Sequence, residues 1–281
     1  MFFVASQEKL WYDGIIFRKA GSPMKQPKII FFDIDGTLIA LGSQGISERT
    51  IEALSRLKAK GTKICIATGR SPVCLPDFCG MEFDCYLTFN GSLCYGPEGV
   101  IFSNPIPRDD VKRILRNTAA MGRPVSVATK SRLAANGIDQ DLADYYAIAH
   151  LELTVAEDFQ EACREEVYQI MLGCRESDYS TILDGVAGTK ITASWDRAAD
   201  VIPKSSGKGT GVRQVLAHFG LSKEDAMAFG DGNNDIELLE SVGTGVAMEN
   251  ASERLKAVSN LVCGPVSQDG IYHFLLEHGL I

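Results

Sequence analysis

Several features that would decide a protein class are missing from this 281-residue sequence. It has eight cysteines but no C-x-x-C pair, and only four histidines, so the spacing matches neither a zinc site nor a disulfide framework. No apolar run approaches the ~20 residues of a membrane-spanning helix, since even Ile29–Phe32 meets a charge at once. There is no low-complexity tract and no internal repeat, and 45% of the residues are hydrophobic, which excludes disorder as the main state.

The charge balance excludes further classes. The formal net charge is −8, and an acidic surface disfavours general binding to nucleic acid or to an anionic membrane. The scattered cysteines are best interpreted as small buried apolar residues in a reducing compartment. We therefore expect a cytoplasmic globular protein that binds neither nucleic acid nor membrane, and the sequence leaves its oligomeric state open.

The first 27 residues carry no clear signal. The apolar stretch Phe2–Ala5 is too short for the core of a signal peptide, and no basic residue precedes it. Residues 1–27 are consistent with an added peptide, an upstream start or an ordered extension. We treat them as a leader of open status and leave them out of the fold prediction.

Alternating strand and helix signals begin after this leader. Lys28–Phe32 is a short, nearly continuous apolar run, typical of a strand buried on both faces. Apolar residues at helical spacing follow in Ser47–Lys60, with Ser47 as a candidate N-cap. Further buried strands are expected at Ile64–Ala67 and Asp84–Phe89. Strands and helices joined by short links predict a parallel sheet wrapped by helices.

The same alternation returns late in the chain, whereas the middle differs. The late elements expected are helices at Thr210–Phe219, Asn234–Ser241, Ser252–Val258 and Ile271–Glu277, and strands at Ala226–Phe229 and Gly245–Met248. Between residues 93 and 202, predicted strands follow one another directly, beginning with Leu93–Tyr95 and Val100–Phe102, which favours antiparallel pairing. We predict an α/β protein: a Rossmann-like parallel sheet core with helices on both faces, formed by residues 28–92 and 203–281, plus an α+β cap domain inserted at residues 93–202.

Polar motifs follow the predicted buried strands. Ligands of open parallel sheets bind outside the carboxyl ends of the strands, so these positions are the first candidates for a site. The motifs are Asp33–Thr37 (DIDGT), Thr68–Arg70 (TGR), Gly207–Gly209 (GKG) and Gly230–Asp235 (GDGNND). Most of them, taken alone, are ordinary turns or surface loops. A charge directly after Ile-Ile-Phe-Phe, however, is unusual as core packing, and the four motifs in this order indicate a functional site.

The residue types in these motifs indicate a site that binds a metal and an anion. Asp33, Asp35 and Asp231 are expected to converge on one crevice. Carboxylates so close together are unfavourable unless a cation lies among them, and oxygen ligands with room for water and phosphate suit Mg²⁺. Lys208 and the hydroxyl of Thr68 would supply a positive charge and a donor for an anion beside that metal. Such a combination is typical of phosphoryl transfer.

These motifs resemble those of the haloacid dehalogenase-like phosphatases, and among them the Cof-type group with a large α/β cap. The similarity rests on D-x-D-G-T at Asp33–Thr37, on Thr68, on Lys208 and on G-D-x-x-N-D at Gly230–Asp235. It extends over about residues 28–279. The resemblance implies a Mg²⁺-dependent phosphatase that hydrolyses small phosphate monoesters, such as sugar phosphates or similar metabolites.

The resemblance also implies a role for each motif residue. Asp33 would attack phosphorus and form an aspartyl-phosphate, and Asp35 would protonate the leaving oxygen and then deprotonate water. Mg²⁺ would be held by the side chains of Asp33 and Asp231 and by the main-chain carbonyl of Asp35. Asp235 would orient Lys208, or a water at the metal, rather than bind the metal directly. Phosphate or substrate contacts are expected from Ile34, Thr68, Gly69, Arg70, Asn90, Lys208 and Asn234.

Other functions use similar residues. A response-regulator receiver, which is a signalling module, also has an aspartate at a strand end, Mg²⁺, a threonine and a lysine. It lacks an acid/base at the position of Asp35 and needs no lid. A phosphomutase or phosphotransferase shares the aspartyl-phosphate and differs only in the acceptor. Dehalogenation is disfavoured, because Asp35 suits the protonation of an alkoxide and the metal suits phosphate.

The inserted domain is expected to choose the substrate. The four motifs are occupied by the phosphoryl group, the metal and the acid/base, so the rest of the ester must be recognised by the cap. A large lid excludes bulk water and also a folded phosphoprotein. Hinges are expected near Gly91–Ser92 and Pro203–Lys204, where residues that interrupt regular elements occur.

Overall fold

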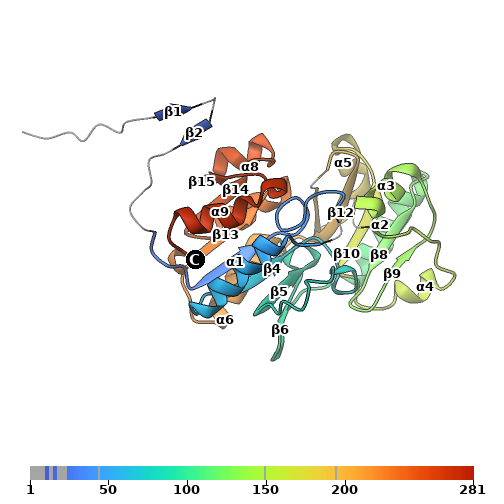
Figure 1. Cartoon of the computed structure of the whole chain (residues 1–281). Coiled ribbons are helices and arrows are strands. Elements are labelled where there is room, and N and C mark those ends of the chain that lie inside the picture. Colours follow the sequence, from blue (N-terminus) through green and yellow to red (C-terminus); the bar gives the residue numbers. More distant parts are fainter. Residues whose placement is uncertain (1–9, 13–14, 18–23, 44, 149, 194) are drawn as a thin grey trace, which may run out of the picture.

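The computed structural model describes residues 10–12, 15–17, 24–43, 45–148, 150–193 and 195–281. They form a core and a cap, at the left and right of Figure 1. Within the leader, β1 (Leu10–Tyr12) pairs antiparallel with β2 (Ile15–Phe17). Apart from residues 24–27, the rest of the predicted leader lies outside the described residues. None of the helices in the described segments is long and apolar enough to cross a membrane.

The core is organised by an eight-stranded sheet of order β15-β14-β13-β3-β4-β5-β6-β7. Its strands are β3 (Ile29–Phe32), β4 (Lys63–Ala67), β5 (Cys85–Thr88), β6 (Leu93–Gly96), β7 (Gly99–Ser103), β13 (Ala226–Gly230), β14 (Thr244–Met248) and β15 (Leu261–Cys263). The six strands from β15 to β5 run parallel, whereas β6 and β7 are antiparallel to their neighbours. All four residues of β3 are fully buried, which explains their unbroken apolar sequence.

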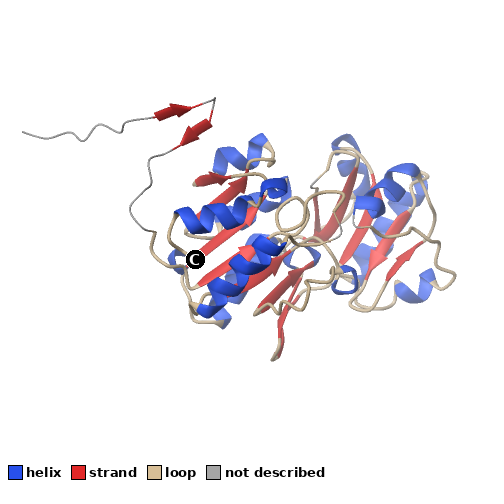
Figure 2. Ribbon diagram, viewed as in Figure 1, coloured by secondary structure: helices blue, strands red, loops and turns tan. Residues whose placement is uncertain are grey.

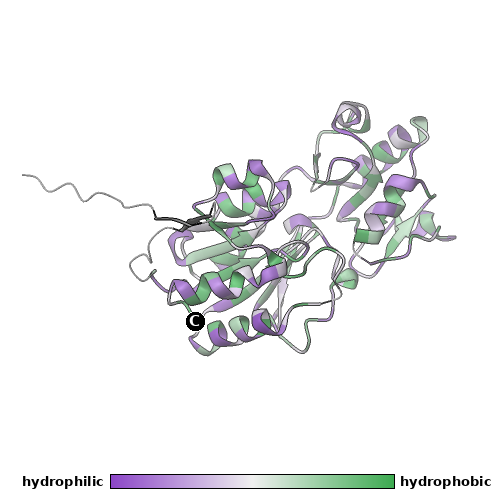
Figure 3. Ribbon diagram, turned by 45° about the horizontal axis from the view of Figure 1, so that its top comes forward, coloured by the Kyte–Doolittle hydropathy of each residue, from purple (hydrophilic) through white to green (hydrophobic). Residues whose placement is uncertain are grey.

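Helices cover both faces of this sheet (Figure 2). They are α1 (Glu48–Ala59), α6 (Lys208–His218), α7 (Ile236–Glu240), α8 (Glu253–Val258) and α9 (Gly270–Glu277). The predicted start of α1 is confirmed, because the Ser47 side chain accepts a hydrogen bond from the backbone N–H of Thr50. Figure 3 shows strands that are mainly hydrophobic and helices that alternate hydrophobic with hydrophilic residues. This is the pattern expected of a sheet buried between helix layers.

The cap contains a five-stranded antiparallel sheet of order β11-β12-β10-β8-β9. Its elements are α2 (Arg108–Ala120), β8 (Val125–Ala128), β9 (Leu133–Ala135), α3 (Gln140–Ile148), α4 (Phe159–Ala162), β10 (Gln169–Gly173), α5 (Tyr179–Ile182), β11 (Thr189–Thr192) and β12 (Ala198–Pro203). Alternate residues of β10 face opposite ways. Ile170 and Leu172 join the cap's hydrophobic core, while Gln169 and Met171 line a cavity between cap and core. One face of the cap sheet therefore forms a roof.

The predicted fold class is confirmed: a Rossmann-like sheet with an inserted α+β cap. The predicted boundary at Leu93 is wrong, because the β6–β7 hairpin extends the core sheet beside β5. The chain leaves the core after Ser103 and returns after β12. At this crossing the Asn104 side chain donates to the hydroxyls of Ser205 and Ser206, at 2.9 and 2.8 Å. The outgoing and returning segments thus lie side by side.

Candidate active site

The loop after β3 brings two carboxylates to the carboxyl end of the sheet. Asp33 continues the buried strand and is 7% exposed. Gly36, in the same loop, adopts φ +83°, and a Cβ atom at this position would lie 2.2 Å from Oδ2 of Asp231. Glycine is therefore required for the loops after β3 and β13 to approach each other. The geometry brings Asp33, Asp35 and Asp231 into one cavity, as the motif spacing predicts.

A buried lysine joins two of the acidic residues. The Nζ atom of Lys208, at the start of α6, lies 2.6 Å from Oδ1 of Asp33 and 2.5 Å from Oδ1 of Asp235. The Lys208 side chain has no exposed surface. The other oxygen of Asp235 accepts the backbone N–H groups of Asp231 and Gly232 at 3.1 and 3.0 Å. Both oxygens of Asp235 thus hold other parts of the site in place.

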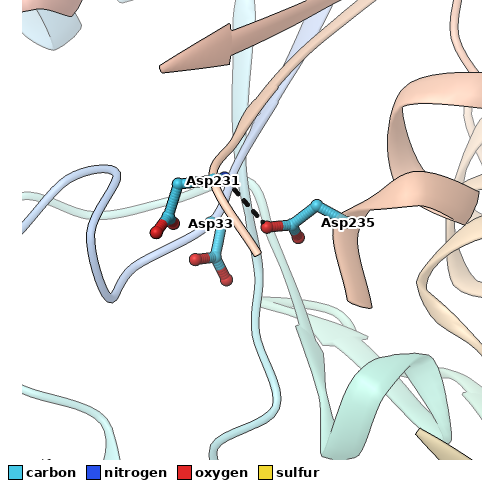
Figure 4. Close-up of side chains that lie close together, drawn as sticks. All are labelled: Asp33, Asp231 and Asp235. Atoms are coloured by element: carbon cyan, nitrogen blue, oxygen red, sulfur yellow. Dashed lines mark hydrogen bonds between the residues drawn. The ribbon is translucent and has the colours of Figure 1, made fainter. Parts of the chain in front are cut away.

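The acidic residues crowd one another. Figure 4 shows Asp33, Asp231 and Asp235 arranged around a common space, with the hydrogen bond from Asp231 to Asp235 dashed. Burial and then the charge of Asp235 raise the pKa of Asp33 well above its ordinary value. The same two causes raise the pKa of Asp231 to about 7. Burial alone would lower the pKa of Lys208, but the carboxylates of Asp235 and Asp33 outweigh it and raise that pKa. Among the described residues, the three carboxylates of Asp33, Asp231 and Asp235 thus share a single cation, Lys208.

The donor set fits a hard divalent cation. One oxygen from each of Asp33, Asp231 and Asp235 lies within 4.8 Å of the others. Carboxylate oxygens with space for further oxygen ligands suit Mg²⁺. The hydroxyl of Thr37 donates to Oδ1 of Asp231 at 2.9 Å and so fixes the orientation of that carboxylate. An added cation would also relieve the repulsion that raises the pKa values of Asp33 and Asp231.

Arg70 contacts the second aspartate of the first motif. Its Nε and Nη2 atoms donate to the two oxygens of Asp35 at 2.9 and 2.6 Å, and Nη1 donates to the carbonyl of Cys74 at 2.9 Å. Such a two-point contact fixes both the position and the plane of a carboxylate. Arg70 also lines the cavity, so its predicted contact with substrate stays a prediction beside this contact with Asp35. Motif spacing gave no sign of it, because the two residues lie in different loops.

The phosphate contacts expected near Asp33 are available. Among the described residues, the backbone N–H groups of Ile34 and Gly69 donate to no protein group. The Thr68 hydroxyl accepts the backbone N–H of Arg70 at 3.1 Å, which leaves its own hydrogen free to donate. Thr68 and Gly69 line the same cavity as Asp33. Beside Asp33 there are thus two backbone amides and one hydroxyl that can still donate a hydrogen bond, together with the ammonium group of Lys208.

Asn90 lies in a strained turn of the core, and its side chain contacts the cap. Phe89, Asn90 and Gly91 follow β5 with φ values of 51°, 53° and 82°. Non-glycine residues rarely adopt such values, so the surroundings must hold the turn in place. The carbonyl oxygen of the Asn90 side chain accepts from Asn234 at 3.1 Å, and its amide donates to Asp200 of the cap at 3.0 Å. Asn234 lines the cavity, whereas Asn90 is buried and bonded to Asn234 and Asp200, so the predicted substrate contacts of both residues stay predictions.

The cavity between the two lobes has a volume of about 290 Å³. Its floor contains the motif residues of the core, and its roof includes Leu133, Tyr145, Tyr146, Met171, Trp195 and Asp200. These cap residues were not predicted individually. Asp200 carried a usable signal, since it is a charge within the otherwise apolar run Ala198–Pro203, as Asp33 is beside Ile29–Phe32.

Comparison with known proteins decides the family. The sequence matches the haloacid dehalogenase-like hydrolase family over residues 30–275. The chain belongs to the haloacid dehalogenase-like hydrolases. The predicted resemblance, and the prediction of a phosphatase of this family, are confirmed.

Individual relatives cover nearly the whole chain. The structure of a sugar phosphatase of subclass IIB of this family is 33% identical, with a TM-score of 0.82 over 90% of this chain and all of that one. A structure described for a trigonal-bipyramidal intermediate of a phosphoryl-transfer superfamily is 32% identical, with a TM-score of 0.85 over 91% of this chain and all of that one. The phosphatase YitU of Bacillus subtilis, named for 5-amino-6-(5-phospho-D-ribitylamino)uracil, is 28% identical over 90% of this chain and 98% of its own.

Proposed function

We propose that this haloacid dehalogenase-like phosphatase hydrolyses small phosphate monoesters through a phosphorylated Asp33, with Mg²⁺ as cofactor. The proposal rests on the groups that surround Asp33. Its carboxylate lies 2.6 Å from the buried ammonium of Lys208 and shares a cavity with Gly69, whose backbone N–H is free. A nucleophile beside a buried cation and an unused amide donor is arranged to receive an anionic phosphoryl group.

The reaction divides into two displacements. In the first, an oxygen of Asp33 forms a bond to phosphorus, the bond from phosphorus to the ester oxygen breaks, and Asp35 gives that oxygen a proton. In the second, Asp35 takes a proton from water, the water oxygen bonds to phosphorus, and inorganic phosphate leaves with Asp33 restored. Arg70 would hold Asp35 in position through both steps.

Asp33 and Asp231, with the main-chain carbonyl of Asp35, would hold Mg²⁺, which supplies charge stabilisation to the phosphoryl oxygens. Asp235 would act as a positioning residue, since its oxygens already accept from Lys208 and from two backbone amides. The clustering of three carboxylates supports a cation at this place.

The size of the cavity supports a small substrate. A volume of about 290 Å³ beneath a folded roof suits a metabolite and not a phosphorylated side chain on a folded protein. The names of the sugar phosphatase and of YitU point to small esters as well. All eight cysteines are free thiols, which supports a reducing compartment such as the cytoplasm.

The test has three parts. Phosphate release from 4-nitrophenyl phosphate and from a metabolite panel should require Mg²⁺, and full activity in excess EDTA would contradict the metal assignment. Borohydride reduction during turnover should convert Asp33 to homoserine, which peptide mass spectrometry detects. Absence of that product, with turnover continuing, would refute the aspartyl-phosphate. Release of phosphate to water, rather than transfer to a second substrate molecule, separates hydrolysis from the phosphotransferase alternative.

A further inference from the structure

Asp200 is a buried carboxylate in the roof of the cavity. It lies on β12 opposite Met171 of β10, and both side chains face the cavity. Asp200 is only 4% exposed, and the flanking residues Ala199 and Val201 belong to the hydrophobic core of the cap. The sequence therefore places a charge on the one face of an apolar strand that looks toward the catalytic motifs.

The hydrogen bonds of Asp200 come from neutral groups. The hydroxyl of Tyr145 donates to Oδ1 at 2.9 Å, and the amide of Asn90 donates to Oδ2 at 3.0 Å. Within the described residues Asp200 has no salt-bridge partner, and Lys208 is already bound to two other carboxylates. Burial raises the pKa of Asp200 to about 7. A buried carboxylate without a cation is unfavourable, unless a ligand brings the missing partner.

The surroundings of Asp200 restrict that ligand further. Leu133, Tyr146, Met171 and Trp195 line the roof and present mainly apolar surface. The hydroxyl groups of a sugar would lose hydrogen bonds to water against such a wall, whereas a ring would gain burial. The roof therefore combines an apolar surface, against which an aromatic group can pack, with one negatively charged hydrogen-bond acceptor.

We propose that Asp200 selects phosphate monoesters whose leaving group carries a cationic or N–H donor group on an apolar or aromatic ring. The inference rests on the proposed phosphatase function and specifies its substrate class. The phosphoryl group would lie on the floor with Asp33, the ring would lie against Met171 and Trp195, and the donor would meet the carboxylate of Asp200. Asp200 would thus be a specificity residue without part in the chemical steps.

A purely structural role for Asp200 makes a different prediction. If its carboxylate served only to hold the cap to Asn90, its replacement would weaken the hydrolysis of every ester by a similar factor. A specificity residue changes the ratio between substrates. The ratio is therefore the measurement that separates the two roles.

The probes are benzyl phosphate, 3-(aminomethyl)benzyl phosphate and 3-carboxybenzyl phosphate, which share one type of leaving alkoxide and differ in charge. The variants are Asp200→Asn and, as a control, Asp109→Asn, which removes the same charge from an exposed position of α2. The wild type and the control should favour the amine over benzyl phosphate by at least about tenfold in kcat/KM and disfavour the carboxylate. In Asp200→Asn the ratios should fall close to one.

Unchanged ratios in Asp200→Asn would overturn the proposal, as would a wild type that does not favour the amine. If Asp200→Asn does not fold, the wild type alone decides: its preference for the amine should grow between pH 6 and pH 8 as Asp200 ionises, and a flat ratio would overturn the inference. Of the other titratable groups near the cavity, Tyr145 stays neutral because burial raises its pKa, and Lys208 keeps its charge. Asp33 and Asp231 line the same cavity and would be held ionised by Mg²⁺ in the active enzyme. A wild type inactive on benzyl phosphate and on 4-nitrophenyl phosphate would instead refute the proposed function.

Discussion

Replacing Asp200 by asparagine should change how the stability of the protein depends on pH. The carboxylate is 4% exposed, and its partners, Tyr145 and Asn90, are neutral donors. Burial raises its pKa in the folded protein to about 7, against about 3.9 in an unfolded chain. Because the folded state binds this proton more tightly, ionisation of Asp200 destabilises the fold, and Asp200→Asn removes the effect.

The size of the effect follows from the two pKa values. Three pKa units correspond to about 4 kcal/mol at about 1.36 kcal/mol per unit. Between about pH 4 and pH 7 the unfolded chain has lost this proton while the folded protein keeps it, so the free energy of unfolding falls as pH rises through that range. From pH 5 to pH 8, the wild type should lose roughly 2–3 kcal/mol that Asp200→Asn does not lose.

Urea denaturation at pH 5 and pH 8 measures this difference directly. EDTA in all buffers keeps the metal site out of the comparison, and every other titrating group cancels because it is common to both proteins. The exposed-site variant Asp109→Asn should follow the wild type. The difference in unfolding free energy between wild type and Asp200→Asn should therefore change with pH. If it is the same at both pH values, within about 0.5 kcal/mol, burial does not raise the pKa of Asp200 and the reasoning is refuted.

Further outcomes are expected from the motif residues and the metal. Asp33→Asn should lose turnover by many orders of magnitude, measured as phosphate release, while its circular dichroism spectrum stays unchanged. Lys208→Ala should reduce kcat/KM by about 10²–10³, as the removal of one preorganised electrostatic contact does; a small change in KM alone would contradict its contact with phosphate. Arg70→Lys should lower kcat and leave KM nearly unchanged, because lysine cannot make the two-point contact with Asp35. A rise in KM as large as the fall in kcat would favour a direct contact of Arg70 with substrate. Removal of Mg²⁺ by dialysis against EDTA should abolish activity, and re-addition should restore it.

The buried parallel strands could be predicted because their apolar runs are continuous. β3 and β14 are buried along almost their whole length, so a local pattern was sufficient. The edge strand β15 was missed, because its apolar run is only three residues long. The four-residue helix α4 was missed for a similar reason, since it spans little more than one turn and shows no period.

The assignment of the β6–β7 hairpin to the cap failed for a non-local reason. Its sequence predicts two adjacent antiparallel strands, and these are present. Whether such a hairpin joins one sheet or another depends on the pairing of its outer edge, here with β5, and local sequence does not encode this choice.

In the site, residues that follow strand ends could be predicted, because the carboxyl ends of parallel strands meet at one edge. The hydrogen-bond partners of these residues could not be predicted. Arg70 and Asp35 are 35 positions apart in two different loops, and their contact depends on how those loops fold over each other. The cap residues around Asp200 come from separate strands and a helix, so no spacing in the sequence marks them as one surface.

The adjacency of Asn104 to Ser205 and Ser206 has a consequence for how this protein is divided into parts. The whole cap occupies the place of a single surface loop, because the chain departs from and rejoins the core at one point. A short turn could bridge that gap and leave a capless core with its four motifs open to solvent. If the cap chooses the substrate as proposed, chemistry and choice of substrate reside in separable modules, and a lineage can exchange the second by one insertion event without rebuilding the first.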